Sequence, residues 1–331
     1  MKSNYRCLRH SIRVRLNYML NLYNLKNLRN EIKKKDSSKK IIVVMLLEHL
    51  GDIVACEPIV RYIKKKNPNA YVIWGVKKAY LELVENNPNV DKTLMIHCLT
   101  ERLLLENSGL FDEVVDLHFQ DRYCSLCRRP FKKDNNFSKI NLSNYFYHGS
   151  LLSAMAQSAG LAALDDQPAV YIPESAVRKV DNIQLPKEFI AINCTSNSSE
   201  KGWPADKWLQ LLTEMKSSIG LPVYEIGTES FFDKSLSISQ SLCGKLSILE
   251  SAEVIKRANL FIGIDSGPAH LANAVQTPGV ILLGSFMGFE NYQPFSGFYQ
   301  NSPKVEIIQT KGPVANIPGE TVFSAVRRLL V

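Results

Sequence analysis

Three junctions along the chain place reactive residue types directly after an apolar run, at the start of a helix-like segment. The first is Leu50-Gly51-Asp52, in which the glycine permits a tight turn and the aspartate opens the following helix. A carboxylate in this position can cap the helix, and it can also act as a general base that takes a proton from a substrate hydroxyl. The residue types alone leave both roles open for Asp52.

The second junction lies within residues 193–208, NCTSNSSEKGWPADKW. Its loop contains the hydroxyl residues Thr195 and Ser196, followed by Lys201 and by Pro204, which is well placed to begin a helix. Hydroxyl groups, backbone N–H groups and one ammonium group are the partners that a diphosphate requires. The alternative is a polar surface loop with a solvated lysine.

The third junction is Asp265-Ser266-Gly267-Pro268, which ends an apolar run and opens a helix, with His270 in the first turns. The unpaired N–H groups at a helix start form an anion site. The stretch matches neither the G-x-G-x-x-G fingerprint nor a Walker A loop, and this disfavours a dinucleotide oxidoreductase. His270 taken alone would more often be a structural histidine of the helix.

The surrounding sequence predicts the elements that must position these junctions. Short apolar runs alternate with helical periodicity, which is typical of βαβ units and a parallel sheet. We expect strands over 41–47, 70–76, 92–96, 113–117, 188–194, 222–227, 259–264 and 279–284. We expect helices over 53–66, 79–86, 99–107, 148–162, 205–217, 229–242, 248–258, 267–276 and 319–331. Two such series predict an α/β fold with two facing Rossmann-like domains, whose ligands bind at the carboxyl ends of the strands.

The remaining segments complete the predicted organisation. Residues 121–147 have no clear period and are expected to form a long loop, and residues 175–187 are expected to be a linker. Ser247 is expected to be an N-cap, with Glu250 at the capping-box spacing. We therefore expect a basic extension over 1–40, a first domain over 41–180 and a second domain over 181–331.

Most of the positive charge lies in residues 1–40. This segment has twelve Lys/Arg against two acids, a net +10, so the rest of the chain carries −2 of the total of +8. A nearly neutral body argues against a nucleic-acid-binding protein, which would carry basic residues on a domain face.

The same segment also contains apolar residues at helical spacing among the basic ones, namely Ile12, Leu16, Met19, Leu20 and Tyr23. A basic amphipathic helix suits an anionic membrane surface. A helix packed on the body, followed by a solvated run of charges, is the alternative. The segment does not resemble a signal peptide, and no run of the chain is long enough to span a membrane.

The seven cysteines are scattered and odd in number, which indicates a reducing compartment rather than a disulfide framework. Cys124 and Cys127 form a lone C-x-x-C. A zinc site would need two more ligands, for which His118 and His148 are candidates without a recognisable spacing. We therefore expect a loop with two free thiols, and we expect neither a metal nor a cofactor at the reaction site.

Taken together, the three junctions resemble glycosyltransferase family nine, the heptosyltransferases of lipopolysaccharide synthesis. The resemblance is carried in order by LGDIVACEPIVRYIKKKNPNAYVIWGV, NNPNVDKTLMI, KGWPADKW and DSGPAHLANAVQTPGVILLG. It covers residues 41–330 and implies a GT-B fold, with a cleft between two Rossmann-like domains and a C-terminal helix that returns to the first domain. It also implies metal-independent, inverting transfer from a nucleotide sugar, usually ADP-heptose, to a sugar acceptor.

The resemblance implies roles for individual residues by their position in these motifs. Asp52 matches the catalytic base, and Lys201 matches the lysine that neutralises the donor phosphates. Glu229 matches an acid that binds the nucleotide ribose, and Leu246 an apolar residue near the adenine. The other donor-side matches are Thr195, Ser196, Asp265, Ser266, Gly267, Pro268 and His270.

The acceptor side departs from the family pattern in two places. The loop before Gly51-Asp52 commonly has small hydroxyl residues, whereas this chain has Glu48-His49-Leu50. Residues 121–147 have no counterpart in the pattern. We expect His49 and Gly51 to belong to the acceptor loop, and we expect the acceptor contacts to differ from those of the usual inner-core acceptor.

The expected function is transfer of a heptose from ADP-heptose to a lipopolysaccharide-type or other cell-surface glycan acceptor. Asp52 would deprotonate the acceptor hydroxyl, while Lys201 and the helix start at Gly267 stabilise the departing diphosphate. Three alternatives stay open: a transferase using another nucleotide sugar, a nucleotide-sugar epimerase of GT-B fold, and a non-catalytic nucleotide-binding relative. The expected location is the cytoplasm, with the basic helix either at the inner face of the inner membrane or packed on the body, and no nucleic-acid partner is expected.

Overall fold

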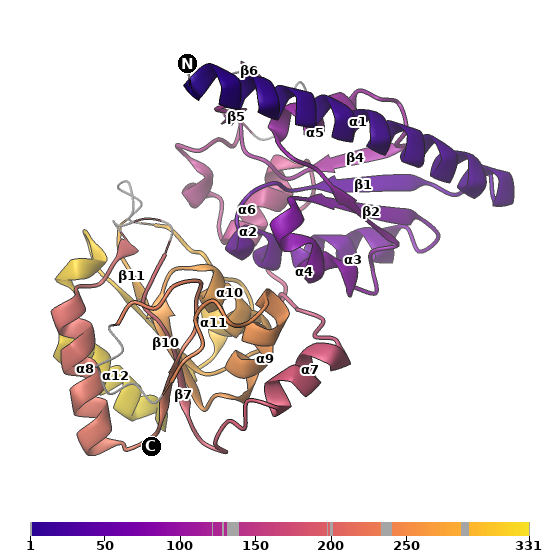
Figure 1. The fold of residues 1–331 in the computed structure, drawn as a ribbon. Coiled ribbons are helices and arrows are strands. Elements are labelled where there is room, and N and C mark those ends of the chain that lie inside the picture. The colour runs from indigo at the N-terminus through magenta and orange to yellow at the C-terminus, as the bar shows by residue number, and fades with distance from the viewer. Residues whose placement is uncertain are drawn as a thin grey trace. The chain divides into compact units, whose positions relative to one another are not determined.

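The fold is that of a computed structural model, which describes residues 2–120, 122–127, 129–130, 139–196, 198, 201–232, 240–285 and 291–330. The chain divides into two compact units, Met1–Leu164 and Asp165–Val331. Each unit is built around its own parallel sheet with helices on both faces (Figure 1). The alternation of strands and helices that the sequence predicts is therefore confirmed.

The first unit contains a four-stranded parallel sheet in the order β3-β2-β1-β4. Its strands are β1 (Ile41–Met45), β2 (Tyr71–Val76), β3 (Lys92–Met95) and β4 (Glu113–Asp116). Every residue of β1 is buried, as the continuous apolar run requires for a strand covered on both faces. Figure 1 shows α1 and α5 on one face and α2, α3 and α4 on the other.

The helices of the first unit follow the predicted order with one change. The predicted helix 53–66 is two helices that meet at Cys56, since Pro58 cannot donate the backbone bond that would continue the first one. The helical elements are α1 (Lys2–Lys35), α2 (Leu50–Ala55), α3 (Glu57–Lys66), η1 (Lys78–Tyr80), α4 (Leu81–Glu85), α5 (Leu99–Glu106), η2 (Tyr145–Tyr147) and α6 (Leu151–Ser158). The described part of 121–147 adds a two-stranded antiparallel hairpin, β5 (Tyr123–Cys124) with β6 (Arg129–Pro130).

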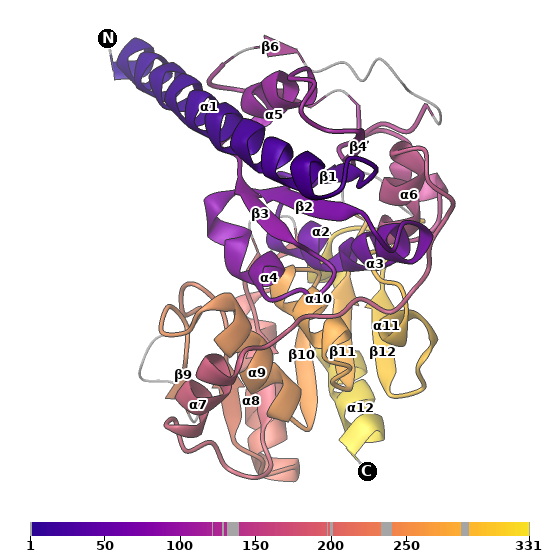
Figure 2. The same cartoon turned by 90° about the vertical axis from the view of Figure 1, so that its right-hand side faces the viewer.

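Helix α1 packs on the first unit. For residues 1–40, the alternative of a helix packed on the body is therefore confirmed. Leu25 and Ile32 join a core that includes Ile41 and Ile73, and α1 lies beside α5 (Figure 2). Polar contacts also hold the helix: Asn21 donates to the Met95 carbonyl at 3.0 Å. The docked face is thus a mixture of apolar and amide side chains.

The apolar residues that the sequence singled out in α1 lie on the opposite, exposed face. We call the apolar stripe the set of large exposed side chains on this helix: Tyr5, Leu8, Ile12, Leu16, Met19, Leu20 and Tyr23. Their exposed fractions range from 50% for Ile12 to 69% for Tyr5, so the contacts with the first unit leave the stripe open. Among the described residues, no helix is long and apolar enough to cross a membrane.

The second unit contains a six-stranded parallel sheet in the order β12-β11-β10-β7-β8-β9. Its strands are β7 (Ile190–Asn193), β8 (Val223–Glu225), β9 (Gln240–Ser241), β10 (Leu260–Ile264), β11 (Gly279–Leu283) and β12 (Val305–Gln309). Its helical elements are α7 (Glu174–Asp181), α8 (Ala205–Ser218), α9 (Ile248–Arg257), α10 (Gly267–Ala274), α11 (Phe298–Asn301), η5 (Val314–Asn316) and α12 (Gly319–Leu330). The predicted cap is confirmed, because the Ser247 side chain accepts from the Glu250 N–H and Glu250 returns a contact to the Ser247 N–H.

Two predicted elements of the second unit are wrong in their described parts. Residues 174–181 form helix α7 rather than a linker, because Ala176 and Val180, four residues apart, bury one helical face. In the predicted helix 229–242, the last described residues form strand β9, and residues 233–239 lie outside the described part of the chain.

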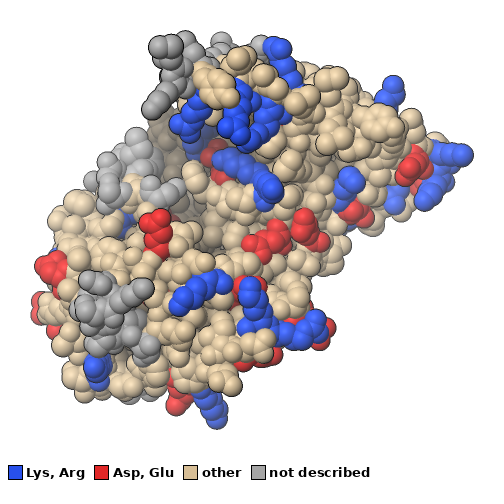
Figure 3. Space-filling model, viewed as in Figure 1, with Lys and Arg blue, Asp and Glu red and all other residues tan. Residues whose placement is uncertain are grey.

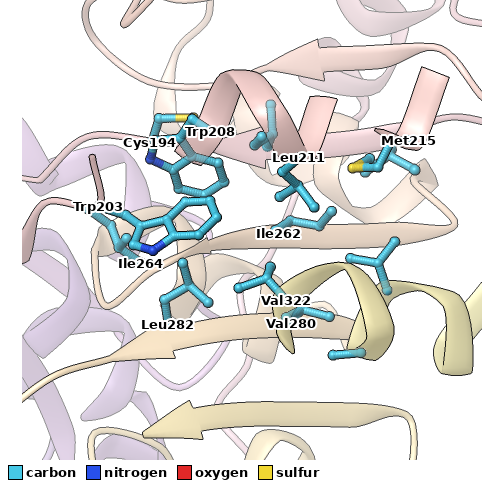
Figure 4. Packing of buried hydrophobic residues seen from close by; sticks show 14 of the residues in the cluster. Cys194, Trp203, Trp208, Leu211, Met215, Ile262, Ile264, Val280, Leu282 and Val322 are labelled. Carbon is cyan, nitrogen blue, oxygen red and sulfur yellow. The ribbon is translucent and has the colours of Figure 1, made fainter. Parts of the chain in front are cut away.

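The core of the second unit lies between its sheet and helices α8 and α12. Figure 4 shows Trp203 and Trp208 packed against this core, and their rings meet edge to face at 4.8 Å between centroids. Helix α12 packs on α8 and on strands β11 and β12. The predicted return of this helix to the first domain, and the predicted boundary at 180/181, stay predictions.

Candidate active-site residues

Asp52 lies where the strand order of the first sheet reverses. Strand β1 pairs with β2 on one side and with β4 on the other, and Asp52 occupies the first turn of α2 after β1. Crevices at such switch points are where open α/β sheets bind ligands. The sequence-predicted residues Gly51 and His49 lie in the same turn.

The capping role of Asp52 is present in the structure. Its Oδ2 accepts a hydrogen bond from the His49 backbone N–H at 2.9 Å, and His49 Nδ1 is 3.7 Å from the same oxygen. The Asp52 side chain is nevertheless 22% exposed, so the cap leaves part of the carboxyl group open to solvent. Capping and the predicted base role are therefore compatible in this geometry.

A buried polar network, which the sequence analysis did not identify, holds the strand that leads to Asp52. The Leu47 N–H donates to His118 Nε2 at 2.8 Å, which places the imidazole proton on Nδ1, 2.6 Å from Asp116 Oδ1. Arg102 Nη2 pairs with Asp116 Oδ2 at 3.0 Å, and the Arg102 and His118 side chains have no exposed surface. Because buried polar groups must be paired, this network fixes the carboxyl ends of β1 and β4 together.

Tyr80, which follows the neighbouring strand β2, also lies close to Asp52. Burial, then the negative charge of Asp52, raises the pKa of the Tyr80 phenol, and a hydrogen bond with the Leu50 backbone lowers it in part. Burial and the Asp52 charge likewise raise the pKa of Cys56. The sequence signal for Tyr80 was its place after a strand next to β1, at the same edge of the sheet.

Lys201 and Asp265 form an ion pair in the second unit. Lys201 Nζ lies 2.6 Å from Asp265 Oδ2, and His270 Nε2 lies 3.9 Å from Asp265 Oδ1. Asp265 and His270 are buried, whereas the Lys201 side chain is 22% exposed. The pair joins the loop after β7 to the end of β10, two neighbouring strands at the point where this sheet reverses its order.

The start of α10 is fixed by a second contact between the same two strands. Ser266 Oγ donates to Asn193 Oδ1 at 2.8 Å, and Asn193 Nδ2 donates to the Ile226 carbonyl at 2.8 Å. Asn193 is buried at the end of β7 and was not singled out in the sequence. A polar residue that ends an otherwise apolar strand was the available signal.

The loop that carries Lys201 is anchored on both sides. Ser196 Oγ donates to the Ser198 carbonyl at 2.7 Å and accepts from the Ser198 N–H at 3.1 Å. After Lys201, the buried Trp203 donates its Nε1–H to the Ile317 carbonyl at 3.0 Å. The side chain of Thr195 faces Gly227, where a Cβ would lie 3.6 Å from Thr195 Oγ1.

Glu229 and Leu246 lie in the loops that follow β8 and β9. The two loops are neighbours, since the Gly244 N–H donates to the Gly227 carbonyl at 2.9 Å. The buried carboxylate of Glu225 shapes the first loop by accepting from the Phe231 N–H at 2.6 Å. Glu229 itself is exposed.

The structure thus brings the predicted residues together in two groups. Around the β7/β10 junction lie Thr195, Ser196, Lys201, Asp265, Ser266, Gly267, Pro268 and His270, with Glu229 and Leu246 on the adjoining loops. We call this group the Lys201 site. Asp52, His49 and Gly51, with Tyr80, form the Asp52 site in the first unit.

Comparison with known proteins supports the resemblance found in the sequence. The profile of glycosyltransferase family 9 (heptosyltransferase) matches residues 150–287. Lipopolysaccharide heptosyltransferase 1 of Campylobacter coli is 25% identical over 295 residues, which cover 76% of this chain and 85% of that protein.

Two solved structures show the same fold. A family 9 glycosyl transferase from Veillonella parvula has a TM-score of 0.66 at 20% identity, covering 88% of this chain and 97% of the other. The ADP-heptose lps heptosyltransferase II of E. coli has a TM-score of 0.64 at 16% identity, covering 88% of this chain and 98% of the other. These likenesses confirm the predicted GT-B fold class. Together with the match to the family, they show that the chain is a glycosyltransferase resembling family 9, the lipopolysaccharide heptosyltransferases.

Proposed function

We propose that this glycosyltransferase moves a heptose from ADP-heptose to a lipopolysaccharide-type or other cell-surface glycan acceptor, with inversion at the anomeric carbon. The observation that carries the proposal is the Lys201–Asp265 pair beside the first turn of α10. This arrangement puts a positioned ammonium group and a helix start where a sheet of this type binds ligands. The relative of known structure in E. coli is described as using ADP-heptose, which motivates the choice of donor.

The Lys201 site has the groups needed to stabilise a departing diphosphate without a metal. Asp265 holds Lys201 in place, and a phosphate oxygen would share the ammonium group with this carboxylate. At the start of α10, Pro268 has no N–H, while the N–H groups of Ala269 and His270 both donate to the Ser266 carbonyl. Among the described residues this leaves the Gly267 N–H as the helix-start donor for an oxyanion, aided by the helix dipole.

The other donor contacts follow from the arrangement of the loops. Thr195 is placed to donate a hydroxyl hydrogen bond on the phosphate side, and the Ser196 hydroxyl would donate there after leaving the Ser198 carbonyl. Glu229 would accept from the ribose hydroxyls, and Leu246 would contact the adenine from the neighbouring loop. An exposed carboxylate suits this task here, because Glu225 holds the neighbouring Ser230 and Phe231 by hydrogen bonds before the ligand arrives.

In the proposed mechanism, Asp52 accepts the proton of the acceptor hydroxyl as that oxygen attacks the anomeric carbon. The bond from the anomeric carbon to the diphosphate oxygen breaks at the opposite face, and the diphosphate leaves with the electron pair. The partial exposure of Asp52 supports this role, and the His118 network would keep the loop before it in place. Inversion is the outcome because one direct displacement takes place.

We also propose that α1 attaches the enzyme to an anionic membrane surface on the cytoplasmic side. The apolar stripe is exposed although α1 is docked, and basic residues flank it, including Arg9, Arg13 and Arg15. Figure 3 shows Lys and Arg side chains gathered at the α1 edge of the first unit. Such a helix would insert its apolar side among lipid headgroups, with about 1 kcal/mol from each nearby basic residue.

A panel of nucleotide sugars tests the donor. ADP-heptose should raise the melting temperature, and UDP- and GDP-sugars should have no effect. The anomeric configuration of the product, measured by NMR coupling constants, should be opposite to that of the donor. Stabilisation by a UDP- or GDP-sugar alone would contradict the choice of donor, and retained configuration would contradict the mechanism.

Vesicle flotation tests the membrane proposal separately. The double change Leu16→Ser and Leu20→Ser should abolish binding to vesicles rich in phosphatidylglycerol, while the enzyme keeps its melting temperature. Tyr147→Ser is the matched control, because it removes an exposed aromatic ring that is not on α1. Equal binding of the control and the double variant would refute attachment through the stripe.

A further inference from the structure

Four residues with metal-ligating side chains meet in the first unit, and none of them belongs to the Asp52 site. His10 lies on α1, Cys98 is the N-cap of α5, and Cys124 and Cys127 lie in the β5–β6 hairpin. One ligand atom of each residue, a histidine nitrogen or a cysteine sulfur, lies within 4.8 Å of those of the other three. Three segments far apart in the sequence therefore converge on one point.

Two distances within this group match those around a tetrahedral metal ion. With zinc–sulfur bonds of about 2.3 Å and zinc–nitrogen bonds of about 2.0 Å, tetrahedral angles place two sulfurs about 3.8 Å apart and a sulfur and a nitrogen about 3.5 Å apart. Cys98 Sγ and Cys127 Sγ are 3.9 Å apart, and Cys124 Sγ is 3.5 Å from His10 Nε2. A disulfide would require sulfurs at about 2.05 Å. The sulfurs are thus spaced as ligands of a common ion.

We propose that His10, Cys98, Cys124 and Cys127 bind one zinc ion in a closed, four-coordinate site. The set consists of three thiolates and one imidazole nitrogen, which is the composition of structural zinc sites, and the C-x-x-C spacing supplies two of the four ligands from one turn. Four protein ligands leave no open position for a substrate, so the ion has a structural rather than a catalytic role. The proposal does not depend on the choice of donor or acceptor.

The sequence analysis considered zinc at this C-x-x-C but looked for the missing ligands in the wrong places. His118 is held in the buried network with Asp116 and Leu47, and His148 is not among the four residues that converge. The two missing ligands, His10 and Cys98, lie 114 and 29 residues from their partners in the group. Only the docking of α1 next to α5 brings them to the hairpin.

The proposed ion would fasten the first turns of α1 to the body. Beyond residue 14 the helix is held by buried residues such as Leu25 and by the amide contacts of Asn17 and Asn21. In the first turns the large side chains Tyr5 and Leu8 are exposed. A metal bond through His10 would hold this part of the helix. It would also support an adjoining groove of about 430 Å³ lined by α1 residues and His97.

Metal analysis of the full chain, purified under reducing conditions without added metal, tests the proposal directly. We expect about one zinc per chain in the intact protein. Cys98→Ser and Cys127→Ser should each lower the zinc content at least tenfold. Cys7→Ser is the matched control, since it removes a thiol from α1 three residues before His10 without touching the group, and it should retain the metal.

Cobalt substitution gives a second readout that does not depend on variants that fold poorly. The wild-type protein, stripped of metal and refilled with Co²⁺, should show the intense visible bands of tetrahedral coordination and a thiolate charge-transfer band in the near ultraviolet. His10→Ala should weaken or shift the visible bands while keeping the charge-transfer band. Circular dichroism of each variant reports whether it has folded.

Three outcomes would overturn the proposal. The first is a wild-type protein whose thiols are all free by titration and which takes up neither zinc nor cobalt. The second is a mass two hydrogens lower than the reduced chain, with Cys98, Cys124 or Cys127 found in a disulfide by peptide mapping. An iron–sulfur chromophore in place of zinc would also contradict the closed mononuclear site.

Discussion

The Asp52 site and the Lys201 site have the same topology, but the side chains after which they are named carry opposite charges. Each lies after the first strand of its sheet, where the strand order reverses, and each includes the first turn of a helix. In the first unit the side chain at that place is a carboxylate, which accepts the His49 N–H. In the second it is an ammonium group, which Asp265 holds at 2.6 Å.

The comparison indicates that the topology of a sheet determines where a ligand can bind. A few residue types then determine which step of the reaction each site can support. A carboxylate can take a proton but would repel a diphosphate, whereas a lysine beside a helix start attracts one. The supporting contacts differ in the same way. A buried network ending in His118 supports the first site, and a short chain of amide and hydroxyl groups, Asn193 and Ser266, supports the second.

The largest effect is expected at Asp52. Asp52→Asn keeps an oxygen that can accept the His49 N–H, but it removes the proposed base, so turnover should fall about 100- to 10,000-fold. Donor binding, measured by calorimetry, should stay within about twofold. Glu85→Gln, an exposed change on α4, is the control. Turnover near the wild-type rate would reduce Asp52 to a helix cap.

A smaller loss is expected at Lys201, and it should affect the donor. Lys201→Ala removes a charge-assisted contact worth about 1.5–3 kcal/mol, so donor affinity and turnover should both fall about 10- to 100-fold. Lys216→Ala, an exposed change on α8, should leave both unchanged. If Lys201→Ala altered only the acceptor KM, the assignment of the two sites would be wrong.

Changes at the supporting residues His118 and Asn193 should have intermediate effects, and these effects should differ between the two sites. His118→Ala leaves the Leu47 N–H and Asp116 without their partner, which should lower the free energy of unfolding by about 1–3 kcal/mol and lower kcat. Asn193→Ala should have a similar cost in stability but raise the donor KM. Urea unfolding measures the stability of both variants, and steady-state kinetics measures their kcat and donor KM. His148→Ala is the control for His118→Ala. If both variants had the same effects on kcat and on the donor KM, the assignment of separate roles to the two sites would be wrong.

The smallest effect concerns Asp112, which helps to dock α1 on the first unit. Burial would raise the pKa of this carboxyl group, but hydrogen bonds from Lys33, the Ile41 backbone and Arg29 lower it to about 2, from an ordinary value of 3.8. The carboxylate therefore stabilises the fold above pH 3.8, and this contribution is lost as the pH falls toward 2. Since the pair is partly exposed, Asp112→Asn should cost about 1 kcal/mol or less at pH 7, by urea unfolding. A difference from the wild type as large at pH 2 as at pH 7 would contradict this assignment.

The sequence predicted most of the two sheets because their apolar runs are short and regularly spaced. Asp52 and Lys201 could be singled out because both lie in a segment that joins such a run to the next predicted helix, where a parallel sheet binds ligands. The capping box at Ser247 was also visible, since its two partners are three residues apart. Local patterns of this kind are encoded within a few residues.

The remaining features depend on contacts between distant segments. The network of Arg102, Asp116 and His118 joins a helix to a strand end, and polar residues of this kind give no periodic signal. Helix α7 was mistaken for a linker because only Ala176 and Val180 bury its face. The orientation of α1 was also hidden, because the face toward the body mixes the amide groups of Asn17 and Asn21 with apolar side chains such as Leu25.

The docking of α1 has a practical consequence for anyone who shortens this protein. Deleting residues 1–35 to remove the exposed apolar stripe would also remove Leu25 and Ile32, which cover Ile41 and Ile73. The truncated enzyme would expose this apolar surface of the core in place of the apolar stripe, and it should precipitate on concentration. Changing the outward residues Leu16 and Leu20 to serine is the better route to a protein that can be concentrated and crystallised, since it leaves the inner face intact.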